Sequence, residues 1–369
     1  MARIVVEEDV VLRLVGIVLD PAADPGRVTA YADYLSPDLA DFSGWRAALR
    51  ADCPRLYPAE VRSVRDRAEL RAQLGWADVA IVESLEIGAV ELALAPRLRV
   101  VQRFGAGLES IDQAACAARG IAVRTLRRRT NLAVAEHTMA LLLNLAKRLR
   151  DLDGRVSAAR LAAAGRPYRP FGRAHTPNAN YGRFPGVTSL RGATLGLVGL
   201  GEIGSEVARL AQAFGMRVLY HKRTRLDPEA ERLRGVSYRD LPGLCATADF
   251  ISLHVPANAA TAGLIDAALL QCMQPHACLI NTSRASLIAR PALLAALAAG
   301  RPAAIALDVH YEEPVRDDDP LLDFPQLLMI PHTGGGSRQN GLADLREMLT
   351  GIDALLTSGL PGAGLPATP

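Results

Sequence analysis

The apolar positions in the middle of the chain switch from a strand-like to a helix-like pattern. Thr194 to Val198 is an apolar run of strand length, and after it apolar residues recur at helical spacing from Ile203 to Phe214. Gly215 is placed to end that helix, and Met216 to Tyr220 is again strand-like. The pattern predicts a strand–helix–strand unit with parallel strands.

The alternation of strand and helix patterns continues on both sides of this unit. Later strands are expected at Phe250 to Val255, Ala277 to Thr282, Ala303 to Val309 and Leu327 to Ile330, and later helices near Asp266 to Cys272, Pro291 to Ala299 and Gly341 to Leu356. In the first hundred residues, Leu12 to Leu19 and Val79 to Val82 are strand-like and Arg65 to Leu74 is helix-like. We predict a doubly wound parallel sheet preceded by a smaller α/β domain.

Between these two parts, Thr130 to Arg150 has apolar residues at helical spacing and basic residues at its end, which predicts a long helix leading between domains. Residues 151 to 190 break the pattern with several prolines, glycines and arginines. Segments of this length without secondary structure are usually functional or disordered. Two interpretations stay open: a solvated surface excursion, or a loop that faces the substrate or contacts a second subunit.

Composition narrows the class of protein. A chain of 369 residues, 50% hydrophobic and 22% charged, is typical of a globular protein and is long enough for two domains. A net charge of +3 does not favour nucleic acid as a partner, and no apolar run approaches a membrane span. The five cysteines are odd in number and include no CxxC pair, so we expect reduced, buried thiols and no metal site. The N-terminus is acidic and has no long apolar run, so we expect a soluble, cytoplasmic protein.

Three glycines follow the strand that ends at Val198. Gly199, Gly201 and Gly204 form a GxGxxG pattern that leads into the predicted helix. The first glycine permits a tight turn, the second lets a pyrophosphate approach the backbone, and the third lets helix and strand pack closely. A tight turn in an ordinary α/β protein is the alternative, but the strand–helix–strand context favours a dinucleotide site.

The end of the next strand bears on which dinucleotide is bound. An NAD site usually has an acidic residue there, which binds the ribose 2′-hydroxyl. This chain has His221 instead, followed by Lys222, Arg223, Thr224 and Arg225. Because cations and a hydroxyl suit a 2′-phosphate that a carboxylate would repel, we predict NADP(H) in preference to NAD(H).

Polar residues with catalytic chemistry follow three of the later strands. Arg284, Asp308, Glu313 and His332 all come shortly after a strand, and ligands of open parallel sheets bind beyond the carboxyl ends of the strands. An arginine can hold a carboxylate bidentately, a histidine can exchange a proton, and a carboxylate can orient that histidine and stabilise its charged form. Each residue alone has a structural alternative, but together they suit the reduction of a 2-oxo acid.

An earlier segment runs from a strand into glycines at Phe104, Gly105, Ala106 and Gly107. Backbone N–H groups in such a turn can bind an anion. A simple strand-to-helix turn explains the spacing equally well.

Six segments, in order, resemble those of the D-isomer-specific 2-hydroxyacid dehydrogenase family over nearly the whole chain: VVQRFGAGLESID, NLAVAEHT, LGLVGLGEIG, INTSRASLI, ALDVHYEEP and IPHTGG. The resemblance implies a flavodoxin-like catalytic domain made of residues 1–128 and 335–369. It also implies an inserted dinucleotide-binding Rossmann domain of residues 129–334, and a homodimer.

The resemblance also implies a role for each candidate residue. His332 would be the acid/base, Glu313 its partner and Arg284 the substrate anchor, with the backbone of Phe104 to Gly107 as a second carboxylate contact. Arg223 and Thr224 match positions where members that use NADP carry Arg and Ser or Thr. Further cofactor contacts are implied at Glu202, Ile203, Val255, Pro256, Thr282, Ser283, His332 and Asp308, the last of these at the nicotinamide end.

The expected reaction is hydride transfer between NADP(H) and a 2-oxo acid/D-2-hydroxy acid pair, with His332 supplying the proton. Glu313 weakens a formate dehydrogenase reading, because that branch pairs its histidine with glutamine. Phosphite oxidation and a dinucleotide-sensing corepressor stay open as alternatives. The basic run from Arg127 to Arg129 and the irregular segment suggest a bulky or additionally anionic 2-oxo acid as one hypothesis.

Overall fold

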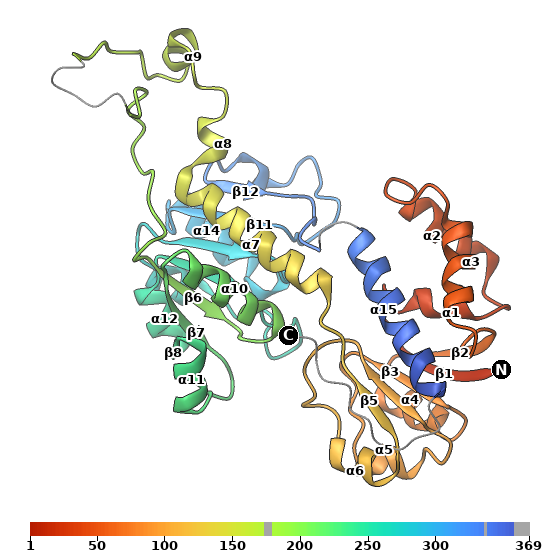
Figure 1. Ribbon diagram of the computed structural model, residues 1–369. Helices are drawn as coiled ribbons and strands as arrows, with labels where there is room; N and C mark the ends of the chain where they lie inside the picture. The colour runs from red at the N-terminus through yellow and green to blue at the C-terminus, as the bar shows by residue number, and fades with distance from the viewer. Residues whose placement is uncertain (173–178, 336–337, 358–369) are drawn as a thin grey trace. The chain divides into compact units, whose positions relative to one another are not determined.

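A computed structural model describes residues 1–172, 179–335 and 338–357. The chain forms two compact units (Figure 1). One consists of Met1–Asn131 and the chain from Gly335 onward, and the other is Leu132–Gly334. Each unit is built around one parallel sheet with helices on both faces, so the predicted pair of parallel α/β domains is confirmed.

The first unit contains a five-stranded sheet in the order β2-β1-β3-β4-β5, with every neighbouring pair parallel. Its strands are β1 (Ala2–Glu7), β2 (Ala59–Val64), β3 (Val79–Val82), β4 (Val100–Arg103) and β5 (Ala122–Arg124). This strand order is that of flavodoxin-like folds, as expected for the smaller domain.

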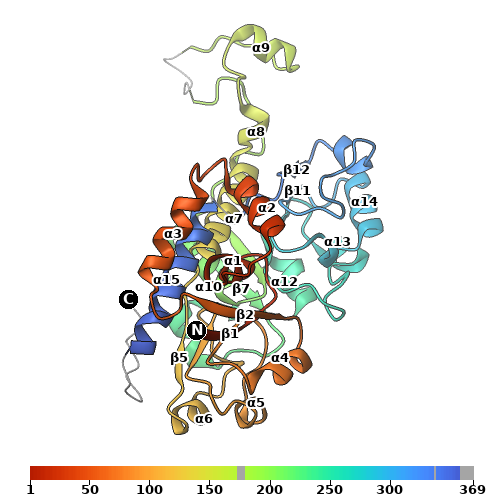
Figure 2. The same cartoon turned by 90° about the vertical axis from the view of Figure 1, so that its right-hand side faces the viewer.

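Helices cover both faces of this sheet. One face carries α1 (Arg13–Leu19), α2 (Pro25–Leu35), α3 (Phe42–Asp52) and α15 (Arg338–Thr357), and the other carries α4 (Arg67–Leu74), α5 (Ala89–Ala93) and α6 (Gln113–Ala118). Figure 2 shows α3 and α15 side by side, although they come from opposite ends of the chain. The unit therefore depends on both of its chain segments.

One prediction in this unit was wrong. Leu12 to Leu19 was expected to be a strand, and the structure places helix α1 there, while the preceding strand β1 was not predicted. Five of the seven residues of α1 are buried, so the segment is apolar nearly all round and carries no helical periodicity. A short apolar run of this kind cannot be assigned to strand or helix by its pattern alone.

The second unit contains a seven-stranded sheet in the order β12-β11-β10-β9-β6-β7-β8, again with every neighbouring pair parallel. Its strands are β6 (Thr194–Val198), β7 (Arg217–His221), β8 (Val236–Tyr238), β9 (Phe250–Leu253), β10 (Cys278–Asn281), β11 (Ala304–Leu307) and β12 (Leu327–Met329). Numbered from β6, this is the doubly wound dinucleotide-binding order, with the switch point between β6 and β9.

Two buried clusters fill the faces of this sheet. One face is covered by α7 (Arg129–Lys147) and α10 (Glu202–Ala213), and the other by α12 (Leu241–Thr247), α13 (Ala267–Cys272) and α14 (Arg290–Ala298). Helix α11 (Pro228–Arg234) connects β7 to β8 along the chain. The unit also contains the 3-10 turns η1 (Ala285–Leu287) and η2 (Pro320–Asp323). The predicted strands and helices of this part of the chain are confirmed, with shorter strands than expected.

The irregular segment after α7 contains two short helices, α8 (Leu149–Leu152) and α9 (Ala158–Ala163). Its two ends are tied together, because the Thr188 N–H donates to the Ala146 carbonyl at 2.9 Å and Lys147 Nζ donates to the Thr188 carbonyl at 2.6 Å. Arg173 and His175, two of its basic residues, lie outside the described residues.

All five cysteines are free, and four of them are buried as expected, whereas Cys272 is exposed. None of the helices within the described residues combines the length and the apolar composition that a membrane span needs.

Candidate functional site

The three glycines of the GxGxxG pattern form the turn between β6 and α10. Gly199 has a φ of +102°, which a side chain would strain, and a Cβ at Gly204 would collide with the Gly199 carbonyl oxygen. At Gly201, a Cβ would meet no described atom within 4 Å, so this backbone faces open space directly before α10. A tight turn, an open backbone and a helix N-terminus are what a dinucleotide pyrophosphate requires, so the residues fit the cofactor.

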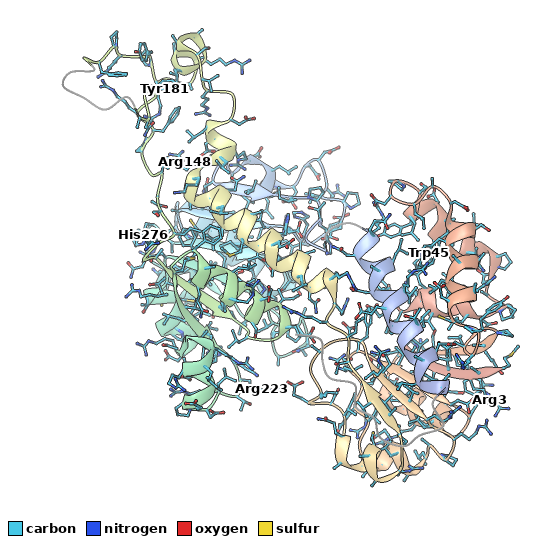
Figure 3. All side chains as sticks on the ribbon, in the orientation of Figure 1. Arg3, Trp45, Arg148, Tyr181, Arg223 and His276 are labelled. Atoms are coloured by element: carbon cyan, nitrogen blue, oxygen red, sulfur yellow. The ribbon has the colours of Figure 1, made fainter. Side chains whose placement is uncertain are left out.

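The basic turn follows β7. His221, the last residue of this strand, has its Nδ1 3.2 Å from the Arg239 carbonyl. Arg225 already pairs with Glu231 at 2.7 Å, so the cationic cluster is smaller than the sequence suggested. Lys222, Arg223 and Thr224 make no side-chain hydrogen bond or ion pair with the described part of the chain, and the last two are exposed (Figure 3, which labels Arg223). These three side chains are therefore available to an anionic ligand.

Two of the candidate catalytic residues are in direct contact. His332 Nδ1 lies 2.8 Å from Glu313 Oε2, and these residues follow β12 and β11, which are neighbours in the sheet. The carboxylate fixes the Nδ1–H tautomer and leaves Nε2 to act on a ligand. The half-exposed His332 side chain is accessible from outside this unit.

A second histidine, His310, supports this pair. Its backbone N–H donates to Glu313 Oε1 at 3.0 Å, and its ring Nε2 lies 2.8 Å from the Ile330 carbonyl. His310 thereby joins the loops after β11 and β12. Partial burial acts to raise the pKa of Glu313, but the hydrogen bonds from His332 and the His310 N–H outweigh it and hold that pKa below its ordinary value. Glu313 is thus a carboxylate when it meets the His332 ring.

Asp308 lies directly after β11 and is 1% exposed. Its carboxylate accepts the N–H groups of Thr333 and Gly334, both at 2.8 Å, and lies 3.3 Å from His137 Nε2. Burial acts to raise the pKa of Asp308, but His137 and the two N–H donors hold it below its ordinary value. This buried charge therefore binds the backbone immediately after His332.

The loop after β10 carries Thr282, Ser283 and Arg284. Thr282 Oγ1 lies 3.1 Å from Thr138 Oγ1 on α7, and Ser283 Oγ donates to the carbonyl of Leu253 at 2.7 Å. Leu253 is the last residue of β9, and Val255 and Pro256 follow it in the chain. Arg284 is exposed, and its Nη1 donates only to the carbonyl of Ser283 among the described residues. Its guanidinium therefore has donors left for a carboxylate.

Phe104 to Gly107 belong to the other unit, where they follow β4. The buried Phe104 donates its N–H to the Val82 carbonyl at 2.7 Å, and Arg128 stacks over the Phe104 ring at 4.2 Å. Arg128 also pairs with Glu83 at 2.8 Å, and Arg129 pairs with Asp344 at 3.1 Å. Two arginines of the basic run therefore already have acidic partners within their own unit.

Sequence reasoning missed His137 and His310. His310 lies in the same segment as Glu313, but its role depends on a contact of its ring with the Ile330 carbonyl after the neighbouring strand, which the sequence does not indicate. His137 lies in the middle of a helix pattern, where a polar residue is more often solvent-exposed. The contact between the His137 ring and Asp308 becomes visible only once the packing of α7 on the sheet is known.

The second unit also contains a cavity of about 840 Å³ at the other edge of its sheet, where the strands begin. Its lining includes Arg148, Arg155, Asp249, His276 and Cys278. None of the sequence-predicted site residues lies there, so the cavity is separate from the glycine turn and from His332.

Comparisons with known proteins agree with this arrangement. Residues 139–334 match the model of the family described as D-isomer specific 2-hydroxyacid dehydrogenase, NAD binding domain. The chain is 36% identical over 254 residues to a glyoxylate reductase of Aeropyrum pernix, covering 68% of this chain and 71% of that protein. It is 34% identical over 275 residues to a D-3-phosphoglycerate dehydrogenase of Mycobacterium tuberculosis, covering 74% of this chain and 48% of that protein.

Among solved structures, the chain is similar to an NADPH-dependent glyoxylate/hydroxypyruvate reductase of Sinorhizobium meliloti in complex with NADP and malonate. The TM-score is 0.54 at 26% identity, and the match covers 97% of this chain and 94% of the other.

Proposed function

Since the chain belongs to the D-isomer-specific 2-hydroxyacid dehydrogenase family, and is an NAD(P)-dependent oxidoreductase of 2-oxo and 2-hydroxy acids, we propose that it reduces a small 2-oxo acid with NADPH and that His332 is the acid. The observation that carries the proposal is the 2.8 Å contact of His332 Nδ1 with Glu313, at the sheet edge that also carries Arg284. An imidazole held by a carboxylate, at the same sheet edge as an arginine with donors left, suits proton transfer to a 2-oxo acid.

In the proposed reaction each side chain has one task. Arg284 binds the substrate carboxylate. The dihydronicotinamide, when bound, supplies the hydride for the carbonyl carbon. His332 Nε2 gives its proton to the carbonyl oxygen, and Glu313 stabilises the charged ring before that transfer. Gly199, Gly201, Glu202, Ile203 and Gly204 hold the pyrophosphate at the start of α10.

The test is turnover of NADPH with a panel of 2-oxo acids that includes glyoxylate and hydroxypyruvate, in the wild type and in His332→Ala. Loss of a general acid costs about 10²- to 10⁴-fold in rate. We expect that loss in kcat with an unchanged Kd for NADPH, measured by fluorescence. Wild-type turnover by His332→Ala would remove the assignment, and tight NADPH binding without turnover of any 2-oxo acid would favour a sensor.

We propose NADPH over NADH because Lys222, Arg223 and Thr224 follow β7 and have no acidic partner within the described part of the chain. The Sinorhizobium meliloti relative solved with NADP supports the same choice. Arg223→Ala should lower kcat/KM for NADPH about 10- to 100-fold, the range of one lost charged hydrogen bond, and leave NADH nearly unchanged. Arg225→Ala is the control, since its guanidinium pairs with Glu231, and a clear NADH preference in the wild type would reject the proposal.

We also propose that the protein is a homodimer, in which the segment between α7 and β6 contacts the second copy. The segment exposes Val156, Tyr168 and Tyr181 at 69%, 42% and 41%, although large apolar and aromatic side chains are usually covered. Sedimentation of the wild type and of Tyr168→Ser with Tyr181→Ser tests this. A monomeric wild type would reject the dimer, and a dimer unaffected by both changes would reject the contact.

A further inference from the structure

His332 has an unusual backbone conformation. Its φ is +53°, in the left-handed region that few residues other than glycine adopt. This conformation is unfavourable for a residue with a side chain, and it persists only where the surroundings impose it. The direction in which the imidazole leaves the backbone thus depends on contacts made by its neighbours.

The Asp308 carboxylate supplies these contacts. One oxygen accepts the Thr333 N–H and the other accepts the Gly334 N–H, each at 2.8 Å. A Cβ at Gly334 would come within 2.6 Å of Asp308 Oδ2, so the carboxylate fits only against a glycine. The two peptide groups directly after His332 are therefore fixed by one buried anion.

His137 is the third neighbour of that carboxylate. Its Nε2 is buried and lies 3.3 Å from Asp308 Oδ1. Among the described residues this nitrogen has no partner at full hydrogen-bond geometry, so the Asp308 carboxylate is the acceptor that it faces. A Cβ at Gly334 would also meet His137 Cδ2 at 3.4 Å, so the ring lies against the same peptide. The next residue of α7, Thr138, contacts Thr282 in the loop that carries Arg284, which fixes the helix at this edge of the sheet.

We infer that His137 is a positioning residue for His332. The His137 imidazole packs against the Asp308 carboxylate, and that carboxylate holds the two backbone N–H groups that follow His332; we call this arrangement of His137, Asp308, Thr333 and Gly334 the clamp. The clamp keeps His332 in its left-handed conformation, with the imidazole of His332 on Glu313. The clamp also joins the two places where the chain enters and leaves the second unit, since His137 follows Leu132 on α7 and Gly334 is the unit's last residue.

The inference rests on the proposed role of His332, and its effect on rate follows from geometry. Without the His137 ring, Asp308 keeps the two backbone N–H donors but loses the side chain that faces its Oδ1. A buried carboxylate with less compensation binds its donors in a less defined arrangement. A small misplacement of a catalytic group costs up to about 100-fold in rate. We expect about a tenfold loss of kcat in His137→Ala, with KM for NADPH unchanged.

The experiment compares the wild type with His137→Ala and His137→Gln, whose amide nitrogen reaches about as far as Nε2 and keeps a donor. His276→Ala is the matched control, because His276 also contacts an aspartate at 2.8 Å, in the same unit but at the opposite sheet edge. The measurements are kcat, KM and the pH profile with NADPH and glyoxylate or hydroxypyruvate, the melting temperature, and the imidazole ¹⁵N spectrum, in which His332→Ala identifies the His332 signals.

We expect His137→Ala to lower kcat, change the pH profile and replace the single Nδ1–H pattern of His332 by an averaged one, while His137→Gln restores most of each and His276→Ala changes none. Unchanged kcat and unchanged His332 signals in His137→Ala would overturn the inference. The inference would also be overturned if His137→Gln lost as much kcat as His137→Ala and if the loss of kcat in each variant matched its fall in melting temperature. If the wild type turns over no 2-oxo acid, the proposed function fails, and the His332 spectrum alone still decides whether His137 orders that ring.

Discussion

The carboxylate of Glu313 is bonded from two sides, by His332 Nδ1 at 2.8 Å and by the His310 N–H at 3.0 Å. Glu313→Gln keeps the shape of this contact but removes the charge that stabilises a protonated ring. We expect a fall of about 10- to 100-fold in kcat, smaller than that of His332→Ala, measured with NADPH and the best 2-oxo acid. Glu312→Gln removes the same charge from the exposed neighbouring residue and should leave kcat unchanged. Equal losses in both variants would indicate a general charge effect.

Two glycines of the turn after β6 should respond differently to the same substitution. Gly201→Ala places a methyl group in open space, so the protein should keep its melting temperature while its Kd for NADPH rises at least tenfold. Gly204→Ala forces a methyl group onto the Gly199 carbonyl and should cost about 1–3 kcal/mol of unfolding free energy. Denaturant unfolding and fluorescence titration of both variants check this. If the Kd for NADPH rose in neither variant, the turn would not hold the pyrophosphate.

The sequence predicts the residues that follow strands better than those that support them. His332 and Glu313 each come directly after a strand of a parallel sheet, so their placement at one edge follows from topology, and the structure brings them into contact. His137 comes from a helix, and its contact with Asp308 depends on how α7 packs on the sheet. Periodicity assigns a helix face but not the residue that this face will meet.

Helices α4 and α5 are joined through one buried carboxylate. Glu91 is fully buried and accepts hydrogen bonds from Arg67 at 2.6 Å, Arg71 at 2.8 Å and the Gly88 N–H at 3.1 Å. These bonds, that of Arg67 first, outweigh the opposing effect of burial and lower the pKa of Glu91 to about 2. Glu91→Gln leaves the arginines without their anion and should cost about 2–3 kcal/mol at neutral pH.

The pH dependence of this loss has a definite sign. Because the folded pKa lies below the ordinary value of 4.5, the carboxylate stabilises the protein above about pH 4.5, and that contribution is lost as the pH falls toward 2. The difference in unfolding free energy between the wild type and Glu91→Gln should therefore shrink over this window. Glu69→Gln is the control and should change little, because it breaks only the exposed pair between Glu69 of α4 and Arg65, which precedes that helix. A constant difference down to pH 2 would contradict the role of the charge.

How well an element could be predicted depended on its surroundings. The strands of the seven-stranded sheet are apolar runs between glycines and polar turns, and all those expected from β6, β7 and β9 onward were found. Helix α1 failed because it is buried nearly all round, and buried helices and buried strands have the same composition. Strand β1 was overlooked since three charged residues follow its short apolar run.

Each of the two units has its own hydrophobic core, but only one is made from a continuous stretch of chain. The core of the first unit includes Leu345 and Leu349 of α15, which come from beyond the second unit. The second unit is closed within Leu132–Gly334 and contains the glycine turn that fits the cofactor. A ligand bound there should stabilise that unit, whereas a defect in α15 should weaken only the other.

Calorimetry of core variants tests this independence. Leu345→Ala removes a fully buried side chain from the first unit and should cost about 2–5 kcal/mol there, while Leu293→Ala in α14 is an equivalent change in the second unit. We expect Leu345→Ala to lower a transition that NADPH does not move, and Leu293→Ala to lower the one that NADPH raises. NADPH binding should survive Leu345→Ala, because the cofactor residues and their core lie in the other unit. A single transition that both variants lower and NADPH raises would mean that the units unfold together, because neither core then holds its unit folded without the other.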